Sequence, residues 1–210
     1  MTLAQSLIAF TAAAAIITVT PGMDTALVLR TAAVGGVRRG MAAAFGIGLG
    51  CLAWGASVAL GLGALIAASH PAYAVLRWAG AAYLAWLGLN LLIRPRDGLA
   101  SLGDARSGGK DSSFGALRRG LATNMLNPKV GVFYVSFLPV FVPAGYSVAP
   151  FLFLLAAIHA IMGVAWLSLI AAATAPLGKA LSRRGVVKAL DRTTGCVFLG
   201  FSARLALAPA

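Results

Sequence analysis

The chain contains no glutamate, only five aspartates and only two cysteines among its 210 residues. Charged residues make up 10% of the sequence, whereas soluble domains carry about one quarter. This scarcity of charge, with 60% hydrophobic residues and a mean hydropathy of +0.90, excludes a water-soluble globule. Within lipid, only helices and closed barrels satisfy their own backbone polar groups. Long unbroken apolar runs favour helices, so the expected fold class is an all-α polytopic membrane protein.

Several kinds of chemical site are also missing from the sequence. Cys51 and Cys196 both lie within apolar runs, which favours neither a disulfide scaffold nor a thiolate metal cage. No Ser-His-Asp set, no His/Cys cluster at metal-ligand spacing and no phosphate-binding loop is present. We therefore expect no enzymatic activity, no metal site and no cofactor.

Basic residues outnumber acidic ones, with 17 lysines and arginines and a net charge of +12. A balance this basic is typical of nucleic-acid-binding proteins. Here the basic residues gather in clusters between apolar runs, as they do in cytoplasmic loops of membrane proteins. The sequence therefore predicts contact with a lipid bilayer and not with nucleic acid.

The apolar runs predict the membrane spans, because about 20 apolar residues cross a bilayer core. Cutting the chain at charges, prolines and glycine-rich turns gives six spans: Leu3–Leu29, Met41–Ala68, Tyr73–Ile93, Leu117–Val142, Ser147–Thr174 and Val186–Leu207. The last span is the weakest, since Lys188, Asp191 and Arg192 fall in its first two turns. Five spans is the rival count.

The loops between these spans predict the orientation. Three connections are basic, and they contain Arg30, Arg38 and Arg39, then Arg94, Arg96, Arg106, Lys110, Arg118 and Arg119, then Lys179, Arg183, Arg184 and Lys188. The alternate loops, near His70 and from Pro143 to Tyr146, contain no lysine or arginine. By the positive-inside rule, both termini face outward.

Residues 94–113 predict a flexible cytoplasmic linker, because they mix Gly, Ser, Asp, Arg and Lys with few apolar residues. The linker divides a single transmembrane domain, residues 1–210, into residues 1–93 and residues 114–210. With three spans in each half, the second half starts on the opposite side of the membrane. Any internal repeat must therefore be inverted, which is an architecture of transporters.

Two prolines, Pro21 and Pro128, interrupt otherwise apolar spans. Thr20 and Asn127 precede them and are suitable N-caps, which predicts each proline at the first position of a restarted helix. The free N–H groups and positive dipole end of such a helix suit a substrate carboxylate. The alternative is a packing kink whose freed groups meet neighbouring Ser or Thr. Counted along the spans, both breaks fall in the inner half of the membrane, whereas an inverted repeat would mirror them about the midplane.

Asp24 is the single acid within an apolar span, and by default a carboxylate there marks a functional site. It follows Pro21 by three residues, where the helix dipole favours an anion. The side chain can bind an amine or carry a proton. Alternatively, Asp24 is a structural residue of the first helical turn near the cytoplasmic surface, paired with Arg30 or Lys129.

Other polar side chains in the spans have two interpretations each. Lys129 can pair with Asp24, contact a substrate carboxylate or snorkel to the inner surface. Asn124 and Asn127 are three residues apart and share a predicted helix face, which suits a polar ligand or a helix interface. His159 suits proton transfer or hydrogen-bonded packing. The candidate site for substrate binding or proton coupling comprises Thr20, Pro21, Gly22, Asp24, Asn124, Asn127, Pro128 and Lys129.

The second span contains a stripe of glycines that includes Gly46 and Gly50 in a GxxxG pattern. Small residues at this spacing let another helix approach closely, and such faces also permit a homodimer. The pattern is not a dinucleotide-binding loop, because no strand precedes it.

Seven stretches carry motifs in a fixed order: Thr20–Thr25, Leu27–Arg30, Gly35–Gly40, Ala79–Gly88, Phe114–Gly115, Gly120–Lys129 and Phe137–Val142. Together they resemble the LysE/RhtB family of bacterial amino-acid exporters, from near residue 5 to near residue 207. The resemblance implies a small inner-membrane exporter of amino acids or derivatives, often drawn with six spans and driven by the proton gradient. Its partners would be the amino acid, protons and the bilayer.

The resemblance also assigns residues. The family's Pro-Gly-x-Asp motif matches Pro21, Gly22 and Asp24, and its Asn-Pro-Lys motif matches residues 127–129, while Met23 stands where the family usually has proline. Members that export basic amino acids often carry an extra acid in the second span, and Gly46–Leu62 has none. This favours neutral substrates such as homoserine, threonine or branched-chain amino acids. An exporter of another small solute or cation, or a non-transporting scaffold subunit, is the alternative.

Overall fold

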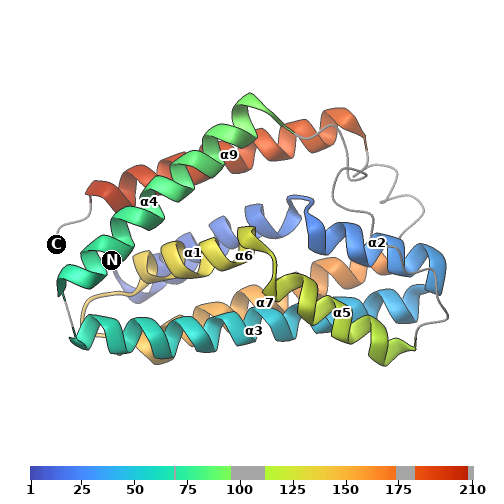
Figure 1. Ribbon diagram of the computed structural model, residues 1–210, viewed down its shortest axis with the longest axis horizontal. Coiled ribbons are helices and arrows are strands. Elements are labelled where there is room, and N and C mark those ends of the chain that lie inside the picture. Colours follow the sequence, from blue (N-terminus) through green and yellow to red (C-terminus); the bar gives the residue numbers. More distant parts are fainter. Residues whose placement is uncertain (69, 96–111, 174–182, 208–210) are drawn as a thin grey trace.

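The computed structural model describes the chain apart from residues 69, 96–111, 174–182 and 208–210 (Figure 1). The described residues form helices and no strand, as the composition predicts. In chain order the elements are α1 (Leu3–Val19), α2 (Met23–Gly35), α3 (Val37–Ala68), α4 (His70–Ile93), α5 (Ser113–Met125), α6 (Pro128–Val132), the π-helix η2 (Phe133–Phe137), the 3₁₀ helix η3 (Leu138–Phe141), α7 (Val148–Ala172) and α9 (Arg184–Leu207).

Two helices in the described part are long and apolar enough to cross a bilayer, namely Val37–Gly61 within α3 and Val148–Ala172. The pair α1 and α2 forms a third candidate span, bent by 51° at its break. Trp78–Ile93 and Lys129–Phe141 are apolar but shorter. The described part is therefore all-helical with two or three clear spans, and the chain is a multi-pass membrane protein. The count of six spans and the inverted repeat stay predictions.

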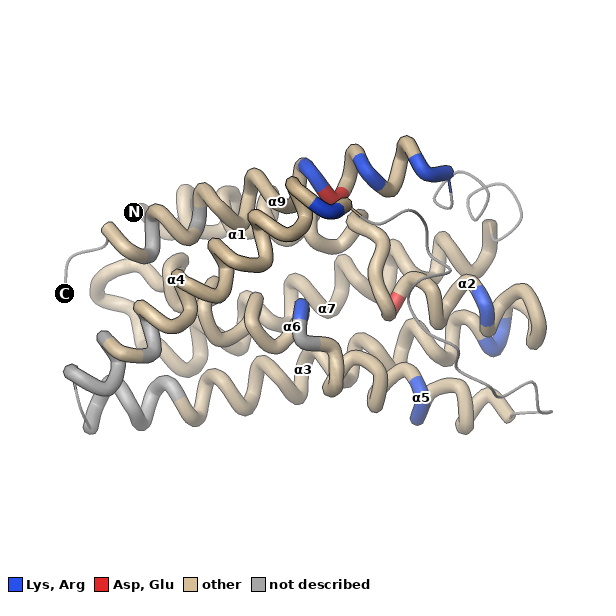
Figure 2. The backbone as a smooth tube through the Cα atoms, turned by 45° about the horizontal axis from the view of Figure 1, so that its top comes forward, with Lys and Arg blue, Asp and Glu red and all other residues tan. Residues whose placement is uncertain are grey.

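Basic residues and chain ends occupy different parts of the bundle. Figure 2 shows that α1 begins and α9 ends at one end, whereas Lys and Arg positions of α2, α5 and α9 lie towards the other end. This distribution agrees with the segregation of basic loops in the sequence. Which end faces the cytoplasm stays a prediction. The predicted linker lies almost wholly outside the described residues, as does Lys179.

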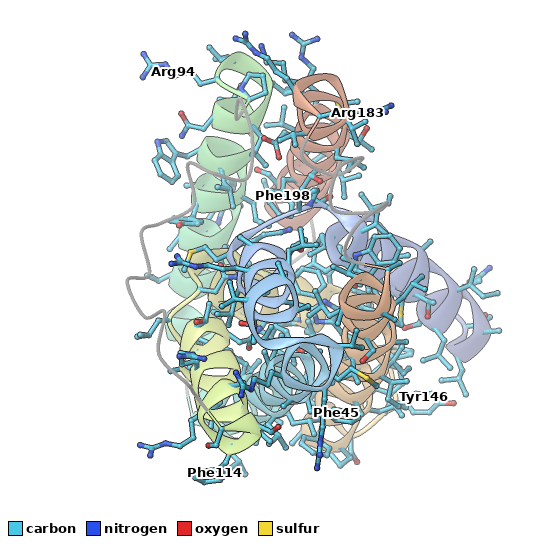
Figure 3. The ribbon with its side chains drawn as sticks, turned by 90° about the vertical axis from the view of Figure 1, so that its right-hand side faces the viewer. Phe45, Arg94, Phe114, Tyr146, Arg183 and Phe198 are labelled. Atoms are coloured by element: carbon cyan, nitrogen blue, oxygen red, sulfur yellow. The ribbon has the colours of Figure 1, made fainter. Side chains whose placement is uncertain are left out.

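Helices from the two predicted halves pack against each other. α3 packs along α5 and α7, while α4 packs along α9. Seen down the bundle, α4 and α9 form a pair above the other helices, with Phe198 between α9 and those helices (Figure 3). Phe198 is buried, whereas Phe45 of α3 and Phe114 of α5 are exposed on the outside. The two sets of helices are thus interleaved and do not form two separate bundles.

The close approach of α3 and α5 depends on glycine, as the GxxxG pattern predicts. A Cβ added at Gly46 would overlap the carbonyl oxygen of Leu117, and one added at Gly120 would overlap that of Ala43. Further along α3, a Cβ at Gly50 would lie 2.6 Å from Oδ1 of Asn124. The stripe therefore brings the backbones of the two helices into direct contact.

An aromatic cluster anchors the irregular segment that follows α6. Phe133, Phe137 and Phe141 are fully buried, and neighbouring rings lie 4.7 and 4.8 Å apart between centroids. Phe10 of α1 packs on Phe133 and Phe141. Proline cannot donate a backbone hydrogen bond, so Pro139 contributes to the change from π-helical to 3₁₀ geometry at this point.

We expect Gly46→Ala to lower the thermal unfolding midpoint of the detergent-purified protein by several degrees, because overpacking costs about 1–3 kcal/mol. Gly61→Ala in the same helix is the matched control, since nothing lies within 4 Å of its added Cβ. Its midpoint should stay level or rise, because alanine is the better helix former. Equal effects at both glycines would contradict the proposed role of the stripe.

Candidate functional site

The first helix break, at Thr20-Pro21-Gly22, differs from the prediction in its capping. Thr20 ends α1, and its backbone N and Oγ1 both donate to Ile16 O, at 3.2 and 2.6 Å. Because this hydroxyl bonds back by one turn, Thr20 does not cap the next helix, and that prediction was wrong. Gly22 is the N-cap of α2, so Pro21 lies within the break and not at the first helical position. Asp24 lies in the first turn of α2.

The second break, between α5 and α6, has the predicted cap. Asn127 is the N-cap of α6, its Oδ1 accepts from Lys129 N at 3.1 Å, and Pro128 is the first residue of the helix. The predicted shared face of Asn124 and Asn127 was wrong. Asn124 belongs to α5, which ends at Met125, and Asn127 lies beyond that end. Both side chains are nevertheless buried.

The two breaks contact each other through two side chains. Lys129 Nζ donates to Ile17 O at 3.1 Å and to Thr20 O at 3.2 Å, which are carbonyls at the C-terminal end of α1. Asn124 Nδ2 donates to Asp24 Oδ2 at 2.9 Å. Residues about 100 positions apart in the chain therefore form one cluster. These bonds of Lys129 to backbone carbonyls of the first break were not among the interactions predicted for it.

A cavity of about 50 Å³ lies between the two breaks, α3 and α7. Six of the eight predicted site residues line it, namely Thr20, Gly22, Asp24, Asn124, Asn127 and Lys129. This polar cavity has room for a few water molecules. It is much smaller than typical ligand pockets of about 300–1,000 Å³. An amino acid can therefore enter only if the elements around the cavity move apart.

Two hydrogen-bond acceptors in this cluster have no partner within the described part of the chain. They are Oδ1 of Asp24 and Oδ1 of Asn124, and both atoms are buried. Buried polar atoms are nearly always hydrogen-bonded, because leaving one unpaired costs about 1–3 kcal/mol. Both residues line the polar cavity. A ligand with several N–H donors, such as an ammonium group, would satisfy both atoms.

Positive charge and free backbone donors border the same cavity. The first N–H groups of a helix have no partner within the helix, and α2 begins with Gly22 as its N-cap. A Cβ at Gly22 would lie 4.0 Å from Nζ of Lys129, which places the ammonium beside this helix end. The cavity thus combines two acceptors with a region that favours an anion.

The sequence analysis missed three residues at this site, two of which contact Asn124 and one of which contacts His159. Cys51 Sγ lies 3.6 Å from Asn124 Nδ2, and Trp54 Nε1 donates to Asn124 O at 3.4 Å. Tyr134 Oη lies 3.0 Å from His159 Nδ1, which agrees with hydrogen-bonded packing of this histidine. A signal existed for two of them. Cys51 and Trp54 follow Ile47 at helical spacing, next to the glycine stripe.

Comparison with known proteins identifies the family. The model of the LysE type translocator family matches residues 15–208. The chain belongs to the LysE family. This confirms the resemblance seen in the motifs.

Relatives of this LysE-family chain match along nearly their whole lengths. A leucine efflux protein of Enterobacter sp. (strain 638) is 32% identical over 90% of both chains. A leucine efflux protein of Klebsiella pneumoniae is 31% identical over 92% of this chain and 91% of its own. The uncharacterized membrane protein YrhP of Bacillus subtilis is 28% identical over 97% and 99%. No solved structure matches.

Cys51 provides a native reporter for the polar cavity, which it lines. In a Cys196→Ser background, we expect a small hydrophilic thiol reagent to modify Cys51 slowly, because this side chain is buried. A transported amino acid should slow the modification further. The measurement is the labelling rate by mass spectrometry, with the Cys51→Ser, Cys196→Ser double variant as the control. Labelling that is insensitive to every exchanged amino acid would contradict a substrate site here.

Proposed function

We propose that this LysE-family protein exports neutral, zwitterionic amino acids or their derivatives across the bacterial inner membrane in exchange for protons. The family and the names of the two leucine efflux relatives support amino-acid export. One observation carries the proposal for the site: Asp24 and Asn124, each with a buried acceptor that lacks a partner, line the same cavity as Lys129 and Gly22 at the start of α2.

In the proposed complex, the substrate ammonium donates to Oδ1 of Asp24 and Oδ1 of Asn124. Asp24 supplies the negative charge, and a charged hydrogen bond of this kind is stronger than a neutral one. Asn124 remains bonded to Asp24 through Nδ2 and so fixes the direction of the carboxylate. The ammonium would thereby satisfy both unpaired acceptors at once.

The substrate carboxylate lies beside Lys129 and the start of α2. Backbone N–H groups at the start of α2 donate to it, and Lys129 offers a positive charge. In the structure Lys129 is bonded to Ile17 O and Thr20 O. Substrate binding therefore competes with the contact between the breaks. Weakening that contact lets the two breaks separate, as alternating access requires.

Asp24 also accounts for the proposed proton coupling. A carboxylate that holds a proton has lost the charge that attracts an ammonium group, so proton and substrate exclude each other. In this cycle, the conformational change occurs when the substrate or a proton is bound at Asp24, and it does not occur when the charged carboxylate has neither. Export of one substrate is therefore coupled to import of one proton. The six spans in two inverted halves belong to this proposal.

Asp24→Asn tests the site directly. We expect the apparent affinity for leucine, measured by counterflow of the radiolabelled amino acid in proteoliposomes, to fall roughly 10- to 150-fold. The reason is that a charged hydrogen bond contributes about 1.5–3 kcal/mol. Stimulation by an imposed proton gradient should disappear. The matched control is Asp104→Asn in the predicted linker, which should behave as wild type.

Two results would overturn this assignment at different levels. Full, gradient-dependent export by the Asp24→Asn variant would remove Asp24 from both roles. No exchange of any amino acid by folded, correctly inserted wild-type protein would overturn the function itself.

A further inference from the structure

A second cavity lies on another side of the α5/α6 break. It measures about 510 Å³, is open to the surface and borders α3, α4, the break and η2. Its lining includes the aromatic side chains Trp54 and Tyr83 and the aliphatic side chains Val132 and Val135. No residue of this lining, which lies wholly within the described ranges, carries a charge. Its volume falls within the range of ligand pockets.

This apolar cavity adjoins the polar cavity. Asn127 lines both of them. Trp54 lies at the junction, because its indole N–H bonds to the carbonyl of Asn124, whose side chain lines the polar cavity. The Trp54 ring rests on Gly131, where an added Cβ would lie 2.9 Å from Cζ2. One tryptophan and the helix break therefore separate the two cavities.

We propose that the apolar cavity receives the side chain of the exported amino acid while the charged groups of the substrate occupy the polar cavity. This inference rests on the proposed function. An α-amino acid carries its ammonium, carboxylate and side chain around one carbon, so its side chain must leave the polar cavity in a single direction. The polar cavity, at about 50 Å³, has no space for a branched or aromatic side chain. The adjoining cavity has that space, and the side chain reaches it when substrate binding displaces the Trp54 ring that separates the two cavities.

The chemistry of the lining defines the substrate class. Aromatic and aliphatic walls favour apolar side chains, whereas a charged side chain would lose its hydration without a partner. We therefore assign amino acids with large apolar side chains, and Val135 and Trp54 as residues that set the size limit. A lipid acyl chain is the competing occupant, because the cavity opens to the surface.

A third hollow, of about 370 Å³ between α1 and α7, also reaches the polar cavity, at Thr18. Its lining includes Val19 and other apolar side chains, together with Thr18 and Trp166, whose Oγ1 and Nε1 atoms are buried without a hydrogen-bond partner in the described part of the chain. It is smaller, more open, and distant in sequence from the α5/α6 break. Because Val19 and Val135 are the same residue type, the two cavities can be compared by one substitution.

The experiment measures counterflow of labelled leucine, labelled alanine and labelled phenylalanine in proteoliposomes for each variant. Val135→Phe fills the apolar cavity and should lower the leucine-to-alanine ratio at least about tenfold, since a single methylene is worth about 10- to 200-fold in such pockets. Val135→Ala enlarges the cavity and should raise exchange of phenylalanine relative to leucine. Val19→Phe and Val75→Phe, the latter at an exposed position, should leave both ratios unchanged.

Each other outcome counts against the inference. Equal leucine-to-alanine ratios in wild type and Val135→Phe, with no change in Val135→Ala, would overturn it and favour a lipid occupant. A leucine-to-alanine ratio that changes only in Val19→Phe would show that the substrate side chain occupies the third hollow and not the apolar cavity. If Val135→Phe does not fold, Val135→Ala decides. Wild-type protein that exchanges no amino acid would overturn the proposed function, whereas an active wild type with unchanged ratios overturns the side-chain pocket alone.

Discussion

The contact between the two helix breaks is the interaction on which the site depends. A broken helix leaves backbone groups without partners, and in lipid each such group costs several kcal/mol. Lys129, beside the second break, satisfies carbonyls at the end of α1, while Asn124, just before that break, bonds to Asp24 just after the first. Each break thus supplies the polar groups that the other requires. The same arrangement concentrates polar atoms where an apolar chain otherwise has few.

Close packing of α3 sets the position of these polar groups. At Gly50 the α3 backbone lies so close to Asn124 that any side chain would collide with its amide. Trp54, one turn further, bonds to the carbonyl of the same residue. One face of α3 therefore contacts both the backbone and the side chain of Asn124. The glycine stripe, which the sequence analysis treated as a packing feature, is also what orients a candidate ligand-binding side chain.

Local rules predicted much of the site and misplaced the rest for physical reasons. Proline in an apolar run and a single acid within an apolar span are visible without any partner helix, and they led to Asp24, Asn127 and Lys129. Thr20 was predicted to cap the start of the second helix, but its hydroxyl bonds to Ile16 O at the end of the first. Residue spacing does not reveal which of these two bonds forms. Helix pairing, such as α4 with α9, depends on shape complementarity between distant segments. That is why the interleaving of the halves was not predicted.

The unpaired acceptors explain why a proton and an amino acid can replace each other in the proposed cycle. Asp24 and Asn124 each present a buried oxygen that needs a donor. An ammonium group supplies donors and a positive charge together. A proton on Asp24 cancels the charge and turns one acceptor into a donor, so it relieves the same deficit by a different route. The site is unfavourable only when neither is present, and this penalty on the empty, charged state is what makes obligatory exchange possible.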